Sequence, residues 1–226
     1  MAIRRVLVTG AAGGLGAAVA SLLAQRGHPV VLGGRDKDAL GALAERIGPP
    51  ATPVPLDVAD EESVRSAPGL SEIDILVNCA GVLTSGRTEP STLDLELAEQ
   101  ELRTNALGAW RVAQAVLPGM VARGWGRIVN VSSGTASFRH GLFAGASGYT
   151  VSKVALNAIT VLLAGETRDS GVLVNAVNPG RIKTKMMPMA ERSPEQAAPA
   201  VCWAATLPDD GPTGRFFAAP DAELDW

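Results

Sequence analysis

Short apolar runs alternate with longer helical patterns along this chain of 226 residues, and this alternation limits the possible folds more than any other feature. Strand-like runs occur at residues 5–10, 29–34, 51–56, 73–78, 126–133, 172–180 and 214–220. Helical patterns occur at residues 14–26, 36–47, 59–66, 95–122, 149–168 and 194–206. Strands that are apolar on both faces and separated by helices form parallel sheets that are covered on both sides. We therefore expect an α/β fold with one doubly wound parallel sheet of about seven strands and helices on both faces.

Composition excludes several classes of protein. The sequence has no linker, repeat or low-complexity tract, so we expect a single domain over residues 1–226. A net charge of −3 without basic runs argues against nucleic acid as the main partner. Cys79 and Cys202 are isolated, so we expect neither a metal site nor a disulfide framework. The apolar run near the start is too short for a signal peptide, and we identify no stretch typical of a membrane span. We expect a cytoplasmic protein that does not bind membranes.

A glycine-rich loop follows the first predicted strand. The residues "VTGAAGGLG" place Gly10, Gly14 and Gly16 after the strand and at the start of a helix. Glycines there permit a tight turn and let the backbone approach a pyrophosphate, and the helix N-terminus offers N–H groups and a positive dipole end. A purely structural turn is the alternative. The position at the first βα turn favours a Rossmann-type dinucleotide-binding domain.

The end of the second strand predicts which dinucleotide is bound. An acidic residue at this position accepts hydrogen bonds from the ribose 2′-hydroxyl of NAD, whereas a nearby arginine suits the 2′-phosphate of NADP. This chain has Gly34 at the acidic position and Arg35 next, followed by Asp36. A carboxylate at Asp36 would repel the phosphate, unless it caps the helix that follows. We expect NADP(H) to be preferred, with NAD(H) possible.

The only tyrosine of the chain lies in "YTVSK", where Lys153 follows Tyr149 by four positions. Residues at this spacing share one face of a helix, so an ammonium would lie one turn beyond a phenol. Alone, the pattern also fits a half-buried core tyrosine with a lysine that extends to solvent.

Seven segments together resemble, in order, motifs of the classical short-chain dehydrogenase/reductase family. They are "TGAAGGLG" (9–16), "LDV" (56–58), "NCAG" (78–81), "TNALG" (104–108), "GRIVNVSS" (126–133), "YTVSK" (149–153) and "NPGRIKT" (178–184). Cys79 replaces the second asparagine of the family's NNAG motif. The C-terminal "PTGRFF" segment is more similar to the carbonyl-reductase branch, yet Ser133 and Tyr149 are only sixteen positions apart, so the long insertion of monomeric carbonyl reductases is missing.

The resemblance implies a set of site residues. Catalytic roles fall to Tyr149 as proton donor, Ser133 for the substrate oxygen, Lys153 for the ribose and Asn105 for a water that leads to solvent. Ser132 is the less favoured candidate for the catalytic serine. The alternative role for Asn105 is purely structural, as an asparagine that bends its helix. The implied cofactor-binding residues are Gly10, Gly14, Leu15, Gly16, Arg35, Asp57, Asn78, Ala80, Gly81, Tyr149, Lys153, Pro179, Gly180 and Thr184. Asp57 would lie against the adenine, and Thr184 would contact the nicotinamide carboxamide.

The chemistry that this family performs requires a tyrosine tuned toward neutral pH. An unperturbed tyrosine has a pKa of about 10, and bringing it near 7 takes about 4 kcal/mol of differential stabilisation. A positive charge about 4 Å away at an effective dielectric near 20 supplies a similar amount. We expect Lys153 to be that charge.

The substrate is less constrained than the cofactor. We expect pocket walls from the loops at 134–148 and 183–195, where Phe138, Phe143 and three methionines (Met186, Met187 and Met189) favour an apolar or aromatic carbonyl compound. His140 lies between the serine and the tyrosine and either borders the pocket or is solvated.

Three functions remain open at this stage. The first is an NADPH-dependent oxidoreductase of the carbonyl-reductase type, acting on a ketone or aldehyde. The second is a 3-oxoacyl-thioester reductase of fatty-acid or polyketide synthesis, which a basic patch for an acidic carrier protein would support. Arg123, Arg127, Arg139 and Arg168 are scattered in sequence, and the sequence does not place them on one surface. The third is a nucleotide-sensing protein without catalysis. The resemblance also implies a homodimer or homotetramer that pairs through the helices at 95–122 and 149–168.

Overall fold

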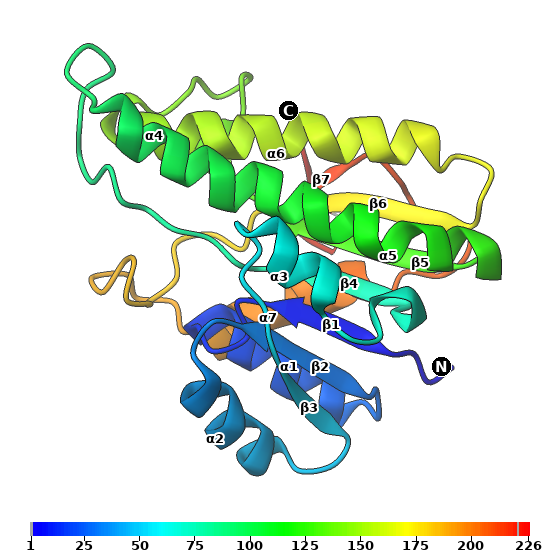
Figure 1. Cartoon of the computed structure of the whole chain (residues 1–226). Helices are drawn as coiled ribbons and strands as arrows, with labels where there is room; N and C mark the ends of the chain where they lie inside the picture. The colour runs from blue at the N-terminus through cyan, green and yellow to red at the C-terminus, as the bar shows by residue number, and fades with distance from the viewer. Residues whose placement is uncertain (1, 221) are drawn as a thin grey trace.

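The computed structural model describes residues 2–220 and 222–226, and its centre is one eight-stranded sheet (Figure 1). The strands are β1 (Val6–Thr9), β2 (Val30–Gly34), β3 (Ala51–Pro55), β4 (Ile75–Asn78), β5 (Gly126–Val131), β6 (Val172–Val177), β7 (Phe216–Ala219) and β8 (Ala222–Leu224). Their order is β3-β2-β1-β4-β5-β6-β7-β8, and every neighbouring pair is parallel except β7 and β8. The predicted α/β fold with a mostly parallel sheet is confirmed. Strand β8 was not predicted, because three residues are too few to show a pattern.

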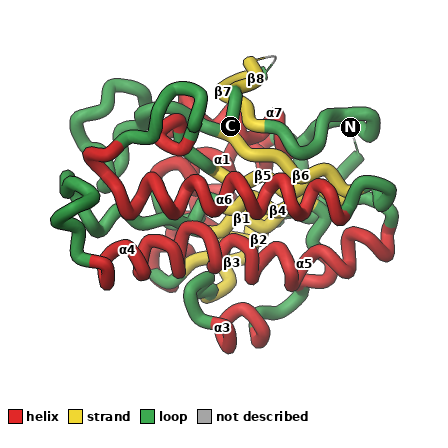
Figure 2. Tube along the Cα trace, turned by 90° about the horizontal axis from the view of Figure 1, so that it is seen from above, coloured by secondary structure: helices red, strands yellow, loops and turns green. Residues whose placement is uncertain are grey.

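Helices cover both faces of this sheet, as predicted. They are α1 (Gly14–Gln25), α2 (Lys37–Ile47), α3 (Glu61–Ser66), α4 (Leu95–Leu102), α5 (Ala109–Arg123), α6 (Ser147–Glu166) and α7 (Pro194–Ala205). A π-helical turn, Arg103–Gly108, joins α4 to α5 into one long helix. Figure 2 shows α4, α5 and α6 side by side over one face, with α1 and α7 behind the strands.

Two apolar cores follow from the alternation of side chains along the strands. In β4, Ile75 and Val77 point into the core under α1 and α7, whereas Leu76 points into the core under α5 and α6. Strand side chains alternate between faces with a period of two, so a strand that is apolar at every position feeds both cores. This explains why the strand runs are continuously hydrophobic in the sequence.

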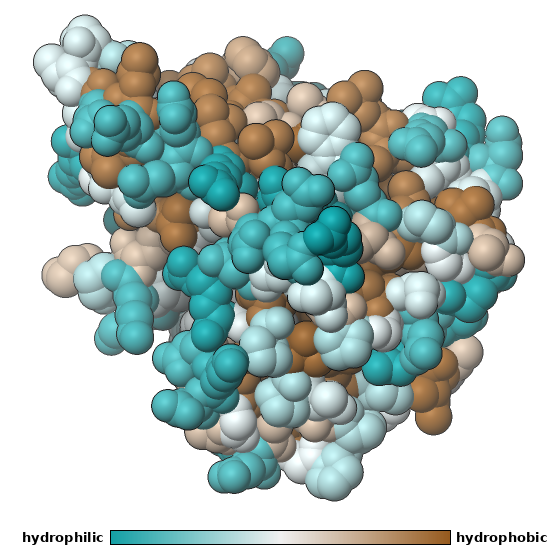
Figure 3. All heavy atoms as spheres, viewed as in Figure 1, coloured by the Kyte–Doolittle hydropathy of each residue, from teal (hydrophilic) through white to brown (hydrophobic). Residues whose placement is uncertain are grey.

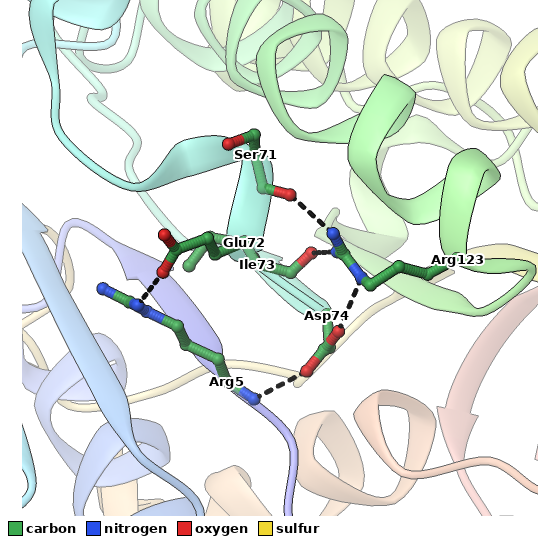
Figure 4. A network of polar contacts seen from close by, with 6 residues as sticks. All are labelled: Arg5, Ser71, Glu72, Ile73, Asp74 and Arg123. Atoms are coloured by element: carbon green, nitrogen blue, oxygen red, sulfur yellow. Dashed lines mark hydrogen bonds and ion pairs between the residues drawn. The ribbon is translucent and has the colours of Figure 1, made fainter.

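A polar network joins the amino ends of β1 and β4 to the end of α5 (Figure 4). The Arg123 guanidinium donates to the carbonyl oxygens of Ser71 and Ile73, both at 2.6 Å, and to the carboxylate of Asp74 at 3.2 Å. Asp74 also accepts from the backbone N–H of Arg5 at 3.0 Å, and the Arg5 side chain pairs with Glu72. Arg123 is therefore held in a structural network, at the end of the sheet opposite to the glycine-rich loop.

One helix differs from the expectation that no stretch resembles a membrane span. The segment Ala144–Glu166, which contains α6, is long and apolar enough to cross a membrane, with a mean hydropathy of 1.2. However, 56% of its most apolar window is buried within the protein. Several of its apolar side chains, among them Leu156 and Leu163, pack into the core instead. A comparison with membrane spans by length and composition alone does not take this packing into account.

The strand order reverses between β1 and β4, and a crevice forms at such a reversal, outside the carboxyl ends of the strands. Thr9 links β1 to the backbone that follows β4, because its hydroxyl oxygen accepts from the backbone N–H groups of Cys79 and Ala80, both at 3.1 Å. The ends of β1 and β4 are thus held together where a dinucleotide would lie.

Candidate active site

The glycine-rich loop is as tightly packed as the sequence predicted. Gly10 has a φ of 64°, and a Cβ added there would lie 2.8 Å from the Cα of Ala80. A Cβ at Gly16 would collide with the carbonyl oxygen of Gly10. These glycines are therefore required by the turn and by the approach of α1 to the loop.

The N-terminus of α1 is prepared for an anion. Helices α2, α3, α4 and α7 begin with side-chain caps, from Asp36, Asp60, Asp94 and Ser193. Helix α1 instead follows Gly13, which makes no side-chain cap, and its first turn contains no acidic residue. Its first N–H groups and the positive end of its dipole thus remain available to a phosphate group. The residues present fit a dinucleotide pyrophosphate.

The end of β2 places Gly34 in the sheet and Arg35 on the surface. Asp36 begins α2, and its carboxylate accepts from the backbone N–H of Ala39 at 3.0 Å. The acidic neighbour therefore has the capping role. Among the described residues, Arg35 takes part in no ion pair, which leaves its guanidinium able to bind a phosphate.

The two adjacent serines after β5 have different surroundings. Ser132 is buried and donates to the Asn157 side-chain oxygen at 2.6 Å, which fixes it in the core. The Ser133 oxygen accepts from the N–H and the hydroxyl of Thr135, at 3.2 and 3.0 Å. Ser133 keeps its own hydroxyl proton to donate, so it is the serine that can act on a substrate oxygen.

Tyr149 and Lys153 lie one turn apart in the first half of α6. Lys153 is only 4% exposed, and its Nζ donates to the carbonyl oxygen of Val131 at 2.7 Å. The same Nζ lies 5.6 Å from the centroid of the Tyr149 ring. An ammonium has three N–H donors, so two of them remain for a ligand. The phenol, the ammonium and Ser133 therefore meet at the carboxyl end of β5.

Burial is the largest influence on the pKa values of Tyr149 and Lys153. Burial raises the pKa of Tyr149 to about 12, and the Ser133 hydroxyl only partly opposes this. Burial also lowers the pKa of Lys153 to about 8. Without cofactor, burial is thus the largest influence on the phenol, and the expectation that Lys153 brings it toward neutrality stays a prediction for the protein with bound cofactor.

Asn105 lies in the π-helical turn between α4 and α5. Its side-chain oxygen accepts from the N–H of Val82 at 2.7 Å, and its amide donates to the Val82 carbonyl and to the Ser152 hydroxyl, both at 2.9 Å. Asn105 thus connects the loop after β4 to the helix that carries Lys153. Its role toward a water stays a prediction.

The residues after β4 form the floor of the site. Asn78 is buried and donates to the carbonyl oxygen of Ala109 at 3.1 Å and to the Asn130 side chain at 2.9 Å. A Cβ at Gly81 would lie 3.3 Å from the Asn105 side-chain oxygen and 3.8 Å from Lys153 Nζ. Glycine here leaves space directly above these groups, where a ribose could lie.

The other predicted cofactor residues lie along the same edge of the sheet. Asp57, after β3, accepts from the backbone N–H of Ala59 at 3.0 Å. Pro179 and Gly180 follow β6, and Thr184 lies over the glycine-rich loop, with its methyl group 3.4 Å from a Cβ at Gly14. Leu15 is buried under this loop. Thr184 is therefore placed beside the glycine-rich loop, and its contact with the nicotinamide carboxamide stays a prediction.

Two loops flank this edge. Phe138, Phe143 and Met189 are exposed apolar side chains, and Met189 is 86% exposed. His140 is also exposed, so nothing beyond its sequence position assigns it to a pocket. The carbonyl oxygen of Trp226 accepts from the N–H groups of Phe138 and Arg139, at 3.0 and 3.3 Å, which attaches the chain after β8 to the first loop.

Sequence reasoning missed Glu101, the fully buried carboxylate of α4. It lies under the start of α6 and binds the loop after β4. The segment "ELAEQEL" offers no signal for it, because Glu96 and Glu99 in the same helix are exposed.

A family model described as short chain dehydrogenase matches residues 4–195 of this chain. Among curated proteins, the chain is 36% identical over 207 residues to the oxidoreductase UcpA of Salmonella typhimurium, covering 87% of this chain and 74% of that one. It is 33% identical over 226 residues to the NADP-dependent 3-hydroxy acid dehydrogenase YdfG of Escherichia coli O6:H1, covering 90% and 89%. It is also 33% identical over 189 residues to the 3-oxoacyl-[acyl-carrier-protein] reductase FabG of Vibrio harveyi, covering 80% and 74%.

The chain spans only 15% of one longer relative, the glycine betaine reductase ATRR of Emericella nidulans, to which it is 35% identical over 192 residues. Solved structures agree in fold. A short chain dehydrogenase/reductase family protein superposes with a TM-score of 0.85 at 33% identity, over 96% of this chain and 95% of that one. A serine dehydrogenase in complex with NADP+ superposes with a TM-score of 0.83 at 29% identity, over 93% and 92%.

Proposed function

The chain belongs to the short-chain dehydrogenase/reductase family, an NAD(P)-dependent oxidoreductase family, and from this premise we propose that it reduces a ketone or aldehyde with NADPH. The observation that carries the proposal is the convergence of Ser133, Tyr149 and Lys153 beside the uncapped N-terminus of α1. A phenol, a hydroxyl and a buried ammonium next to an anion site are what carbonyl reduction by a dinucleotide requires.

The protein supplies the proton and holds the reacting groups in position. When it is bound, the nicotinamide supplies the hydride that reaches the carbonyl carbon. Ser133 donates its free hydroxyl proton in a hydrogen bond to the carbonyl oxygen and orients it. Tyr149 then transfers its phenolic proton to the same oxygen, so that the product is an alcohol. Lys153 binds ribose hydroxyls through its two remaining N–H donors.

Asn105 and the residues after β4 complete the proton path in this proposal. Asn105 holds the loop at Val82 and the helix at Ser152, and between them it would position a water next to Lys153. A water there would return a proton to Tyr149 after each turnover.

The preference for NADP(H) rests on Arg35. Gly34 leaves no carboxylate at the end of β2, and Asp36 is engaged in capping α2, so no described side chain at this point is arranged to bind a 2′-hydroxyl. The exposed Arg35 could hold a 2′-phosphate by charge-assisted hydrogen bonds. The relative YdfG is named as NADP-dependent, which supports the same preference.

The substrate class rests on the loops at 134–148 and 183–195, which we propose as the pocket walls. Their exposed Phe138, Phe143 and Met189 favour an apolar or aromatic carbonyl compound over a sugar. No membrane or nucleic-acid partner is proposed, and the cytoplasm remains the proposed location.

A 3-oxoacyl-thioester reductase is the second candidate, because FabG of Vibrio harveyi is among the similar proteins. The surroundings of the four arginines give little support to a binding surface for an acidic carrier protein. Arg127 is fully buried beside Asp209, and Arg123 is held in the network at Asp74. Arg123, Arg139 and Arg168 are exposed, but Arg139 also lies 3.7 Å from the Asp225 carboxylate, so among the described residues only Arg168 of this set takes part in no ion pair. A nucleotide-sensing protein is the weakest candidate, because the complete set of proton-transfer groups would have no use there.

Consumption of NADPH tests the proposal. The purified chain is mixed with NADPH and with aromatic ketones, quinones, acyl thioesters and sugars in separate reactions. We expect steady oxidation with an apolar ketone or aldehyde. Turnover confined to acyl thioesters would favour the second candidate, and NADPH binding without turnover on any compound would favour the sensor.

A further inference from the structure

The buried carboxylate of Glu101 is an acidic group near the site that the mechanism above does not use. Its residue is 0% exposed. Its Oε1 accepts from the backbone N–H groups of Thr84 and Ser85, at 2.6 and 2.9 Å, and the Ser85 hydroxyl lies 3.0 Å from both carboxylate oxygens. Ionised carboxylates accept hydrogen bonds and donate none, so this set of donors fits a charged Glu101.

No cation neutralises this charge within the described residues. None of the ion pairs there includes Glu101, and the nearby Lys153 donates to the Val131 carbonyl instead. A buried charge without a charged partner is costly, even when hydrogen bonds satisfy it. The buried charge of Glu101 also acts electrostatically on the group that lies next to it.

That neighbour is the first turn of α6. A Cβ at Gly148 would collide with Glu101 Oε2, so the carboxylate touches the residue that directly precedes Tyr149. Helix α6 has no side-chain cap and no acidic residue in its first turn. Glu101, from α4, thus brings a negative charge to the start of the helix that carries the phenol.

We propose that Glu101 is a positioning residue for Tyr149, and that its buried charge favours the protonated phenol and biases the site toward carbonyl reduction over alcohol oxidation. Reduction begins with a neutral phenol that gives up its proton, whereas oxidation begins with a phenolate that accepts one. A fixed negative charge at the residue that precedes Tyr149 stabilises the first form relative to the second.

The other groups around the phenol support this assignment. The groups that act on the phenol are the Ser133 hydroxyl after β5, the Cys79 thiol after β4 and the Glu101 carboxylate in α4, and Lys153 Nζ lies 5.6 Å from the centroid of the Tyr149 ring. After burial, which is the largest cause, Cys79 and Glu101 both raise the pKa of Tyr149. Burial also raises the pKa of the Cys79 thiol to about 12, so at neutral pH the thiol carries no charge. Glu101 is then the negative charge that acts on the phenol.

The chain offers a direct test, because Tyr149 is its only tyrosine. The ultraviolet change on phenol ionisation therefore reports this one residue, and it needs neither cofactor nor turnover. We would titrate the cofactor-free protein and the variant Glu101→Gln, with circular dichroism at each pH to confine the comparison to folded protein. Glutamine can keep both backbone bonds through its amide oxygen and removes only the charge.

We expect the phenol of Glu101→Gln to ionise at a pH lower by roughly half a unit or more than in the unchanged protein. The control Glu99→Gln, which removes an exposed carboxylate of the same helix, should titrate as the unchanged protein does. An equal midpoint in Glu101→Gln and the unchanged protein overturns the proposal, and so does ionisation only on unfolding in both.

A second variant separates charge from attachment. Ser85→Ala removes a hydroxyl donor but keeps the carboxylate, so its midpoint should stay at or above that of the unchanged protein. A lower midpoint would show that the loop contact, and not the charge, controls the phenol. This titration is independent of turnover, so if the proposed reductase function fails, the charge effect can still be judged, whereas the bias toward reduction rests on that function.

The bias itself is measured with an alcohol that the enzyme accepts and NADP+. The rate of oxidation should rise at a lower pH in Glu101→Gln than in the unchanged enzyme, by the same shift as the phenol midpoint. An unshifted profile together with a shifted phenol would contradict the functional part of the proposal.

Discussion

Lys153 Nζ lies 5.6 Å from the centroid of the Tyr149 ring, and its hydrogen bond goes to the Val131 carbonyl oxygen at the end of β5. The ammonium is therefore held by the sheet and not by the phenol. Burial determines the acid–base state of both groups: it raises the pKa of Tyr149 to about 12 and lowers the pKa of Lys153 to about 8. A bound dinucleotide would add the hydroxyl acceptors that the ammonium lacks.

Lys153→Met tests the ammonium. Methionine keeps an unbranched chain of similar length and loses the charge, so NADPH should bind more weakly, by roughly ten- to a hundredfold for a lost charge-assisted hydrogen bond. In the unchanged enzyme, NADPH affinity should also fall above about pH 8, since Lys153 loses its proton there. The variant should show no such fall. Titration calorimetry at several pH values measures both, and equal pH profiles would contradict the ribose role.

Arg35→Ala tests the choice of cofactor. Removing charge-assisted hydrogen bonds to a 2′-phosphate costs about 1.5–3 kcal/mol, which corresponds to roughly a ten- to hundredfold loss of NADPH affinity. NADH affinity should stay almost unchanged. Fluorescence titration with each cofactor measures this, with Arg46→Ala as a control at the far end of α2. If both cofactors weaken equally, Arg35 supports the fold and does not bind the phosphate.

The sequence predicted which residues the fold brings together where a motif lies at or near a strand end. Ser133, Tyr149, Lys153 and the glycine-rich loop lie at one edge because parallel strands place their carboxyl ends together. Asp36 was recognised as a cap because it begins a helical pattern. These predictions depend on local chemistry and on topology, both of which a sequence carries.

The rest depends on packing that no local pattern encodes. Glu101 has the same surroundings in sequence as exposed glutamates, and only the approach of α4 to Gly148 buries it. The raised pKa of Tyr149 follows from burial, which the spacing of a phenol and an ammonium does not reveal. Arg127 reads as a surface charge, yet it is fully buried beside Leu207 and Asp209.

His28 predicts a pH dependence of stability. It is buried, its Nδ1 accepts from the Arg4 N–H at 3.1 Å, and its buried Nε2 has no hydrogen-bond partner among the residues that the structure describes. Burial, the largest cause, lowers its pKa below 6.5. The unfolded chain therefore binds the proton first, so the stabilisation is complete above about pH 6.5 and is lost as the pH falls through the lower pKa of the folded state.

Urea unfolding of His28→Asn checks this expectation. Asparagine can still accept from the Arg4 N–H but does not titrate, so the free energy of unfolding should fall less between about pH 7 and pH 5 than in the unchanged protein, by up to about 1.4 kcal/mol per pH unit. His140→Asn, at the only other histidine and an exposed one, should leave the pH dependence as it is. Equal slopes in His28→Asn and the unchanged protein would show that His28 is not the group responsible.

Exposed apolar side chains on α6 and on the π-helical turn before α5 support the proposal of a homodimer or homotetramer. Leu107, Val151 and Leu162 are exposed, and Leu162 is 63% exposed, on the face formed by α5 with the π-helical turn and by α6. Figure 3 shows hydrophobic side chains among the polar ones along the top of the molecule, where these helices lie. Exposed apolar patches mark interaction surfaces more often than scattered single residues do.

Leu162→Glu should therefore convert the assembly to monomers without loss of secondary structure, because a charge at a buried contact is costly and the side chain is not needed in the core. Light scattering at micromolar concentration measures the mass. Ile3→Glu, which changes an exposed apolar residue outside these helices, should keep the assembly. A monomeric mass for the unchanged protein would rule out the pairing.

Turnover of Tyr149→Phe is the most direct test of the proposed chemistry. Phenylalanine keeps the ring and its packing and removes only the proton. We expect kcat for ketone reduction to fall at least about a hundredfold, the usual lower bound for a general acid, while NADPH affinity and the melting temperature stay nearly unchanged. Since the chain has no second tyrosine to substitute, near-normal turnover in this variant would contradict the assignment of Tyr149 as proton donor.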